Sequence, residues 1–508
     1  MRNDKFISSV CFIRKYDNPD ENGNQVEVSK VSMENQMRLN HEHGLPATYL
    51  LQYDALVDKN YTEIFIDEYK NYDSEIGVWF EVVKPLAEDS GIKWRGRDNR
   101  VWDHFVNPGF LMAYTLEEKK KLIDVFMHKF KELYGFYPKT VGSWLIDTES
   151  MEYISETYSP DAFIICREQW GMDGYTLWGG PYYGAYYPSK NNMQTPAQNI
   201  ENQINTPVFR MYVNDPIYCY YEYAKMKYND IDYGLFTQEP AWMCGKNPQW
   251  IKWHYDNTFK DNNIGIKYTQ LGQENSFGWE KVKYGHEYQI KYAIENKDKY
   301  GYEFVSFSEM GRRFKEENKT TPPMLRYVLD DWADKGNKSV WYNSSRYRIN
   351  IFSDKEQVWI RDIHIFDDNY CDQYLDSPCT TSTAIYDNLP VMDGIRFSDD
   401  TERAGIYFGA GEILSVEKND DTVLVRIMAD GSEIKIILNE KSIEIISDKD
   451  FAIYYKVASN CKFISEYSTK SISFIKDAYK YNLNIEEGKY DGNVIQSEEG
   501  KIILEFNI

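Results

Sequence analysis

The chain has no hydrophobic run long enough to cross a membrane. Hydrophobic residues make up 42% of its 508 positions, but no segment approaches the roughly 20 consecutive apolar residues that a spanning helix needs. The N-terminal stretch MRNDKFISSVCFIRKYD also lacks the apolar length and the small-residue cleavage site of a secretory leader. We therefore expect a cytoplasmic protein without a membrane partner.

Paired cysteines and positive charge are scarce as well. The seven cysteines are scattered, with no Cys-x-x-Cys pair. This pattern suits a reducing compartment and excludes a disulfide framework or a zinc ribbon. Lys and Arg number 58 against 80 Asp and Glu, which gives a formal net charge of −22. That balance argues against nucleic acid as a partner, since a phosphate backbone requires stripes of Lys and Arg.

Aromatic residues, by contrast, are abundant. They make up 16% of the chain, with 43 Tyr and 13 Trp. Most aromatic side chains lie in protein cores. Aromatic clusters beside acids also line sugar-binding clefts, because a sugar ring offers an apolar face for stacking and a rim of hydroxyls. The composition is therefore compatible with a carbohydrate ligand, and the sequence leaves the oligomeric state open.

Short apolar runs alternate with helical patterns over residues 1–320. The clearest helix is predicted at 115–135, where Thr115 and Glu118 have capping-box spacing and Gly135 ends the pattern. Such alternation predicts parallel strands covered by helices, and seven or eight of them favour a barrel. The predicted strands are residues 7–14, 46–52, 75–83, 140–146, 161–166, 207–213 and 265–272, with 303–310 as an eighth strand or an edge piece.

The pattern changes after about residue 335. Runs such as YRINIF and TVLVRIM are separated by Asp, Asn and Gly turns, without comparable helical patterns. This predicts an antiparallel β-sandwich. The expected organisation is a barrel domain over 1–320, a linker over 321–340 within a helix-like stretch, and a β-sandwich over 341–508.

Polar and aromatic residues recur in or directly after the predicted strands. In a parallel barrel the catalytic groups lie at the C-terminal strand ends and on the loops that follow. Two carboxylates facing a sugar-sized cleft are the minimal machinery for cleaving a glycosidic bond. The candidate site residues, in chain order, are Arg14, Asp17, Trp79, Glu81, Asp147, Glu149, Arg167, Trp178, Tyr183, Arg210, Asp215, Glu239, Glu274 and Trp279.

Several motifs resemble the polysaccharide deacetylase superfamily over about residues 5–310. HGLPATYLLQ (43–52) is similar to the second-strand motif of that superfamily, and SEIGVWFEVV (74–83) falls where its members carry two metal-binding histidines. The resemblance implies a distorted (β/α)7 barrel. It also implies a divalent metal held by an Asp and two His, but here the His positions are Trp79 and Val83. We therefore expect the metal site to be lost and no cofactor to be needed.

The segment VGSWLIDTES (141–150) also resembles the nucleophile motif of glycoside hydrolase family 57, which uses the same barrel type. That family places a glutamate three residues after a Trp at the end of strand four, and here Asp147 has that position. Its acid/base lies at the end of strand seven, where this chain has Glu274. The resemblance implies Asp147 as nucleophile or base and Glu274 as general acid, with Glu239 as an alternative acid. The combination with a C-terminal β-domain is similar to uncharacterised glycosidases of gut bacteria.

Non-catalytic roles stay open for these residues. Asp147 also has the N-cap position of a helix beginning DTES, and Glu149 suits its first turn. Arg210 needs an anionic partner if it is buried, and Asp215 is a candidate.

Three functions follow from these patterns. The first is a metal-independent glycosidase with an Asp/Glu carboxylate pair. The second is a carbohydrate-binding protein without turnover. The third is a deacetylase-like enzyme, metal-dependent if other ligands, such as Asp17 and His104, replace the missing pair.

Overall fold

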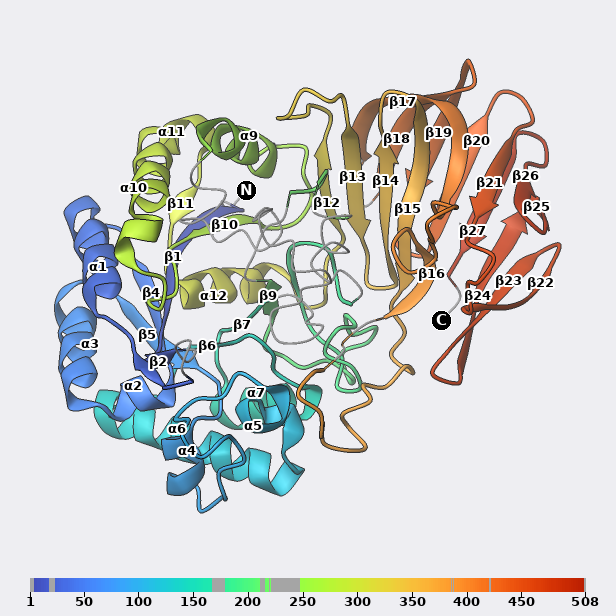
Figure 1. Cartoon of the computed structure of the whole chain (residues 1–508). Coiled ribbons are helices and arrows are strands. Elements are labelled where there is room, and N and C mark those ends of the chain that lie inside the picture. The colour runs from blue at the N-terminus through green and yellow to red at the C-terminus, as the bar shows by residue number, and fades with distance from the viewer. Residues whose placement is uncertain are drawn as a thin grey trace.

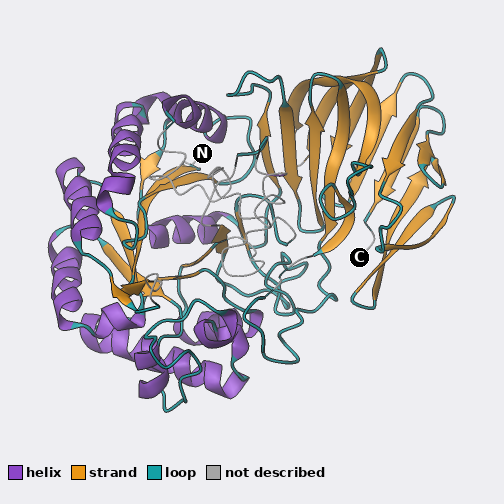
Figure 2. Cartoon of the chain, viewed as in Figure 1, coloured by secondary structure: helices purple, strands orange, loops and turns teal. Residues whose placement is uncertain are grey.

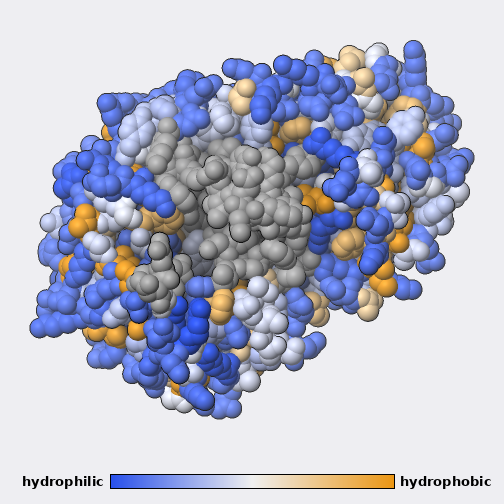
Figure 3. Space-filling model, viewed as in Figure 1, coloured by the Kyte–Doolittle hydropathy of each residue, from blue (hydrophilic) through white to orange (hydrophobic). Residues whose placement is uncertain are grey.

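The computed structural model describes residues 4–17, 23–166, 179–210, 215–218, 220, 247–384, 386, 388–419 and 422–506. An N-terminal part of helices around a sheet lies beside a large β-rich C-terminal part (Figure 1, Figure 2). The residues coloured by hydropathy on the face shown in Figure 3 are mostly hydrophilic, with scattered hydrophobic ones, as expected for a chain with 27% charged residues. Among the described helices, none has the length and apolar character of a membrane span.

The N-terminal part is built on a curved sheet with seven parallel strands. Their order across the sheet is β10-β1-β4-β5-β6-β7-β9. Almost every residue in them is buried, because helices cover the sheet and a parallel sheet has no solvated face. The strands are β1 (Lys5–Ile13), β4 (Ala47–Leu51), β5 (Glu75–Trp79), β6 (Thr140–Ser143), β7 (Ala162–Ile165), β9 (Val208–Arg210) and β10 (Lys267–Leu271).

All seven predicted strands are present, but the sheet is an open half-barrel as far as the described residues show. No backbone pairing between β9 and β10 is seen in that part of the chain. A side chain spans the gap instead, since the Tyr268 hydroxyl on β10 donates to the Arg210 carbonyl on β9 at 2.7 Å. Closure into a (β/α)7 barrel stays a prediction. Two short strands extend the sheet, β8 (Ala185–Tyr186) against β9 and β11 (Glu303–Phe304) against β1.

The helices follow local sequence signals. The capping box of Thr115 and Glu118 is formed at the start of α6, and Gly135 ends the helix with φ 85°. The predicted eighth strand is only β11, because Ser306 caps α12 directly afterwards. The helices are α1 (Val31–His43), α2 (Tyr53–Val57), α3 (Lys59–Asn71), α4 (Lys84–Asp89), α5 (Val106–Gly109), the 3-10 turn η1 (Leu111–Ala113), α6 (Leu116–Tyr134), α7 (Thr148–Tyr158), α9 (Pro248–Thr258), α10 (Trp279–Glu295), α11 (Lys297–Tyr300) and α12 (Phe307–Glu317); β2 (Tyr16–Asp17) and β3 (Val26–Glu27) form a small hairpin.

The C-terminal part is one antiparallel system of 16 strands. The long strand β17 pairs with β15 near its start and with β18 over its second half, which joins two groups of strands. Side chains of both groups share one apolar core. The strands are β12 (Met324–Val328), β13 (Lys338–Asn343), β14 (Tyr347–Ser353), β15 (Gln357–Ile365), β16 (Leu389–Asp393), β17 (Gly405–Asn419), β18 (Thr422–Ala429), β19 (Ser432–Leu438), β20 (Ser442–Ser447), β21 (Ala452–Lys456), β22 (Ile464–Ser468), β23 (Ser471–Lys476), β24 (Tyr479–Glu487), β25 (Lys489–Asp491), β26 (Val494–Gln496) and β27 (Lys501–Glu505).

The prediction of a helix-like stretch at 317–339 is wrong. It contains β12 and the start of β13. Strands β12 to β15 are buried on both faces, with Leu325 and Val340 in the core of the C-terminal part and Met324 and Trp341 against the N-terminal part. Double burial removes the alternation of polar and apolar residues by which an exposed strand is recognised. The domain boundaries themselves stay a prediction.

Candidate functional site

The C-terminal ends of β1, β5 and β10 bring one arginine and two glutamates together. Arg14 follows β1, Glu81 comes shortly after β5, and Glu274 comes shortly after β10. The Arg14 Nε and Nη2 atoms donate to Glu81 at 3.0 and 2.7 Å, and Nη1 donates to Glu274 Oε2 at 2.9 Å. All three residues are buried. A buried guanidinium needs nearby negative charge, and these two carboxylates provide it.

Amide side chains hold this Arg14 cluster in place. Asn275 accepts from the Arg14 backbone N–H at 2.9 Å and donates to the Arg14 carbonyl at 2.8 Å. Gln52, directly after β4, donates to Glu81 Oε2. Groups from four neighbouring strand ends therefore meet, as expected for the functional edge of a parallel sheet.

Aromatic rings surround Arg14. Phe12 stacks on Trp79 with ring centroids 4.2 Å apart, and Trp144 meets both rings edge-on. The Arg14 guanidinium lies 4.6 Å from the Trp102 ring centroid. Trp79 is fully buried, whereas Trp144 is partly exposed. Trp144, and not Trp79 as predicted, can therefore offer a ring to a ligand.

The two glutamates of the Arg14 cluster differ in how far their oxygens are engaged. Glu81 is fully buried, and both of its oxygens accept hydrogen bonds from Arg14 or Gln52. The Glu274 side chain is 10% exposed, and its Oε1 accepts from the Ser276 hydroxyl. Glu274 is thus the carboxyl that a small molecule can approach.

Burial raises the pKa of Glu274 to about 7. The positive charge of Arg14 opposes this rise in pKa, and the negative charge of Asp17 adds to it. Burial likewise raises the pKa of Asp54, at the start of α2, to about 7. A carboxyl with a pKa near the ambient pH can both take up and release a proton.

Asp147 belongs to a second cluster. It caps α7, with Oδ1 accepting from the Ser150 N–H at 3.1 Å and Oδ2 accepting from the Ser150 hydroxyl at 2.7 Å. The buried Lys119 amine on α6 donates to Asp147 at 2.8 Å and to Glu149 at 2.7 Å. Within the described ranges no hydrogen bond or ion pair joins Asp147 to Glu274. This geometry favours the helix-cap interpretation of Asp147, and its predicted pairing with Glu274 gains no support.

The predicted ion pair of Arg210 and Asp215 is not seen among the described interactions. Arg210 donates to the Gly179 carbonyl at 3.0 Å and to Gln194 at 3.1 Å. Asp215 instead accepts from the indole N–H of Trp250 and of Trp332, at 3.1 and 2.8 Å. Burial raises the pKa of Asp215.

The other predicted residues have mixed positions. The Tyr183 hydroxyl donates to the Tyr268 carbonyl at 2.9 Å within the core, and Trp279 is buried at the start of α10. Asp17 ends β2, close enough to Glu274 to affect its pKa. Arg167, Trp178 and Glu239 lie outside the described residues.

The divalent-metal site that members of the deacetylase superfamily carry does not fit the residues present at the corresponding positions. Trp79 and Val83, at the two histidine positions, are buried and apolar. In the part of the chain that the structure describes, no group of three or more His, Cys, Asp or Glu residues is suited to hold a metal ion. The alternative ligand His104 packs against the rings of Trp102 and Phe105.

Four residues of the site were missed from the sequence. Gln52 and Asp54 directly follow β4, and the strand-end rule applied to the other strands would have found them. Trp144 belongs to the motif VGSWLIDTES (141–150), from which only the acids were predicted as site residues. Trp102 lies between α4 and α5 without any periodic pattern, so only the tertiary structure shows that it covers Arg14.

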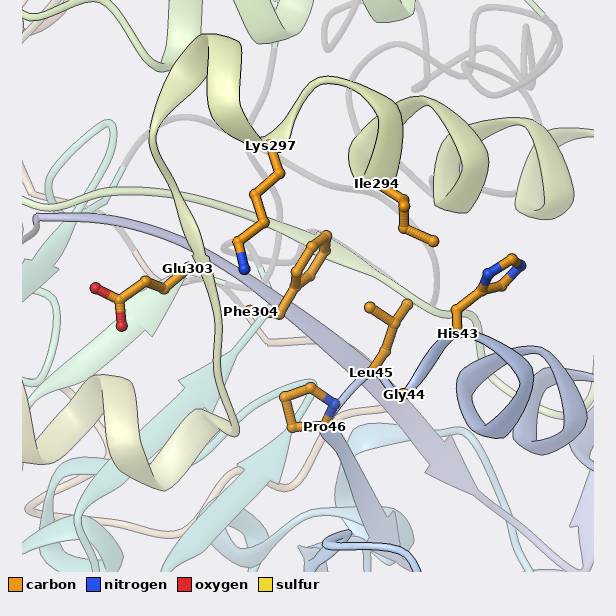
Figure 4. Close-up of a pocket in the computed structure, with 8 residues that line it drawn as sticks. All are labelled: His43, Gly44, Leu45, Pro46, Ile294, Lys297, Glu303 and Phe304. Carbon is orange, nitrogen blue, oxygen red and sulfur yellow. The ribbon is translucent and has the colours of Figure 1, made fainter.

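A surface pocket at the opposite edge of the sheet is a poorer candidate. It is lined by residues around Leu45 and Pro46, just before β4, and by Lys297, Glu303 and Phe304 (Figure 4). Glu303 pairs with Phe6 at the start of β1. The pocket therefore lies at the N-terminal strand ends, away from the Arg14 cluster, where conserved function is not expected in this architecture.

Comparisons with known proteins show a distant likeness of fold. No protein-family model and no curated protein matches the chain. A crystal structure from Parabacteroides distasonis, described provisionally as a glycoside hydrolase/deacetylase, superposes with a TM-score of 0.54 at 12% identity, over 77% of this chain and 89% of that chain. The likeness is one of fold, and it agrees with the distant resemblance expected from the sequence.

Other solved structures match more weakly. A provisional polysaccharide deacetylase from Pseudomonas aeruginosa PAO1 gives a TM-score of 0.37 at 14% identity, covering 62% of this chain and 92% of that one. A family 4 acetyl xylan esterase from Clostridium thermocellum, in complex with cobalt, gives 0.26 at 12% identity, covering 61% and 91%.

Proposed function

We propose that the chain is a hydrolase acting on a carbohydrate and that Glu274 is its proton-transferring group. The observation that carries this proposal is the setting of Glu274. Its carboxyl has a pKa of about 7, is bound to Arg14 at the C-terminal strand ends, and shares that cluster with the partly exposed Trp144 ring. A fold like that of a protein described as a glycoside hydrolase/deacetylase supports a carbohydrate substrate.

Removal of an acyl group is the reaction that this geometry supports best. Deacylation requires a base that takes a proton from water and a positive group near the developing oxyanion. Glu274 would be the base. Arg14 has five N–H donors, and three of them are used in the described ion pairs. This leaves one N–H on each terminal nitrogen to stabilise the oxyanion.

The proposed reaction balances without a metal. Water adds to the acyl carbon while its proton passes to Glu274. The tetrahedral intermediate then breaks its bond to the sugar oxygen or nitrogen, and Glu274 returns the proton to that leaving atom. The products are the free acid and the deacylated sugar.

Cleavage of a glycosidic bond is the second candidate. It requires two carboxyl groups, and Glu81 is fully engaged by Arg14 and Gln52. The second carboxylate would be Asp17, which lies close enough to raise the pKa of Glu274. In this reaction Glu274 would act in its protonated form.

An assay with acetylated oligosaccharides separates the two reactions. Acetate without new reducing ends supports deacylation, and new reducing ends without acetate support glycosidic cleavage. Glu274→Gln should abolish either activity. Glu280→Gln, an exposed glutamate at the start of α10, is the matched control and should have no effect. Turnover that is equal in Glu274→Gln and wild type would contradict the proposal.

A further inference from the structure

Strands β7 and β9 end at the same edge of the sheet as the Arg14 cluster, and one described segment after each strand contacts the C-terminal strands. We call these two segments the loop bases. The first loop base is Gly179–Ala185, and the second is 215–218 with Tyr220. In Figure 1 the segment after residue 179 runs between the N-terminal sheet and strands β12 to β16. Two buried arginines of the C-terminal part hold these bases.

Arg348 on β14 reaches the first loop base. Its Nη1 donates to the Gly180 carbonyl at 2.9 Å and to the Gly179 carbonyl at 3.3 Å. The other side of the guanidinium binds Asp362, with Nε and Nη2 donating at 2.9 and 3.2 Å. Burial raises the pKa of Asp362, but the charges and hydrogen bonds of Arg348 and His364 together outweigh burial and hold that pKa below its usual range. Asp362 therefore stays ionised and fixes the orientation of Arg348.

Gly180 fits closely under a third arginine. It has φ +67°, and a Cβ atom there would lie 1.7 Å from Arg210 Nη2. Arg210, at the end of β9, donates to the neighbouring Gly179 carbonyl. The backbone at Gly179–Gly180 is thus held from the N-terminal sheet and from β14 at once.

Arg361 on β15 holds the second loop base in the same way. Its Nη2 donates to the Pro216 carbonyl at 3.0 Å and its Nη1 to the Ile217 carbonyl at 3.2 Å. The ring of Tyr220 lies under the guanidinium at 4.6 Å, and its hydroxyl donates to the Arg361 carbonyl at 2.8 Å. The Trp341 indole adds a contact to the Pro216 carbonyl at 3.3 Å.

Strand β13 also contacts the first loop base, through side chains that belong to the apolar core beside the Arg14 cluster. The Tyr182 N–H donates to Asn343 Oδ1 at 3.1 Å, and the Tyr182 ring stacks on Trp341 with centroids 3.9 Å apart. Tyr182 and Trp341 belong to the same apolar core as Trp79 and Phe12, which pack beside Arg14. A shift of β13 would therefore reach the site through packed side chains.

We propose that strands β13 to β15 fix the described segments Gly179–Ala185 and 215–218, and that Arg348 and Arg361 are positioning residues for the site at the strand ends. The C-terminal part is then a component of the functional unit and not an independent appendage. The activity readout of this proposal rests on the proposed function. The readout of loop order does not.

The test is Arg361→Lys and Arg348→Lys, measured by amide hydrogen exchange in the full chain without substrate. Lysine keeps the charge but loses the planar fork that spans two carbonyls. We expect exchange at Tyr182, Ile217 and Tyr218 to become about tenfold faster, while β18 to β20 stay as protected as in wild type. Arg426→Lys on β18, which alters exposed pairs with Glu417 and Glu433, is the matched control and should change none of these amides.

On an acetylated oligosaccharide that the wild type turns over, both variants should lose roughly tenfold to hundredfold in kcat/KM, mostly in kcat. If Arg348→Lys fails to fold, Asn343→Ala removes the contacts of the Asn343 amide to the Tyr182 N–H and the Tyr183 carbonyl, and it should speed exchange at Tyr182. Unchanged exchange at the loop bases, or equal loss of protection in β18 to β20, would overturn the positioning role. Glu274→Gln should leave the exchange pattern intact, so failure of the proposed function is distinguishable.

Discussion

Arg14 lies between Glu81 and Glu274, and Lys119 lies between Asp147 and Glu149. Each cluster places one buried cation between two acids at a strand end. In the Lys119 cluster, both Asp147 oxygens are also engaged by Ser150 at the start of α7. In the Arg14 cluster, Glu274 comes three residues after the end of β10 and does not cap a helix with its side chain.

The difference shows that charge content alone does not make a site. A carboxylate that caps a helix and binds a buried amine has both oxygens occupied and has little capacity left for a substrate. A buried carboxyl beside other acids holds its proton up to neutral pH, as Glu274 does with a pKa of about 7.

The largest effect is expected from Glu274→Gln. The amide keeps the shape but cannot transfer a proton, so kcat should fall by about 10²–10⁴-fold. Steady-state kinetics on the acetylated oligosaccharide panel measures this, and thermal unfolding shows that the variant is folded. A loss in kcat of less than tenfold would contradict the functional difference between the Arg14 cluster and the Lys119 cluster.

Asp147→Asn should act on stability and not on turnover. Asparagine can still cap α7, but Lys119 loses one of its two buried partners. We expect the free energy of unfolding to fall by about 2–3 kcal/mol, below the range for a buried charge left entirely unpaired because Glu149 remains. Urea denaturation gives the value. A hundredfold loss of kcat in a fully folded variant would restore Asp147 as a catalytic residue.

The pH dependence should follow Glu274. If Glu274 is the base of a deacylation, kcat/KM rises by about tenfold per pH unit below its pKa and levels off above about 7. If it is the acid of a glycosidase, kcat/KM falls above that pH. The profile of Glu274→Gln, where residual activity is measurable, should lose the inflection.

Stability should depend on pH in a related way. The folded-state pKa of Glu274 is higher than its ordinary value of 4.5, so the folded protein binds the proton more tightly than the unfolded chain. The contribution of Glu274 to the free energy of unfolding therefore decreases as the pH rises from 4.5 to about 7. Asp54 acts with the same sign. The difference between wild type and Glu274→Gln isolates the Glu274 share.

Glu149→Gln is expected to have the smallest effect. Its side chain is 23% exposed, and Lys119 keeps its buried bond to Asp147. The free energy of unfolding should drop by less than about 1 kcal/mol, as for other partly exposed pairs. Urea denaturation of Glu149→Gln and Asp147→Asn under the same conditions shows which of the two acids contributes more to the free energy of unfolding. A larger loss than for Asp147→Asn would assign the main pairing of Lys119 to Glu149.

The strands of the N-terminal part were predictable because each is a short apolar run with its own boundaries. The ends of α6 were predictable too, since Thr115, Glu118 and Gly135 act locally. Residues 317–339 were misread because β12 is buried between the two parts of the molecule, a condition that its own sequence does not record.

The site was predictable in part. Arg14, Glu81 and Glu274 were found because polar residues at parallel strand ends converge on one edge. The ion pairs between them could not be predicted, since Arg14 and Glu274 lie 260 positions apart in the chain. Asp147 had two interpretations in sequence, and its contacts with Lys119 on α6 and with Ser150 favour the helix cap.

The sequence by itself thus determined the parallel strands, the capped helices and the set of acids at the strand ends, because these depend on neighbouring residues. Only the tertiary structure decided which acid has its pKa raised by burial, which arginine joins which carboxylates, and that two arginines of the C-terminal strands bind the carbonyls of Gly180 and Pro216. Burial and ion pairing depend on groups that are far apart in the chain and come together only when the two parts pack.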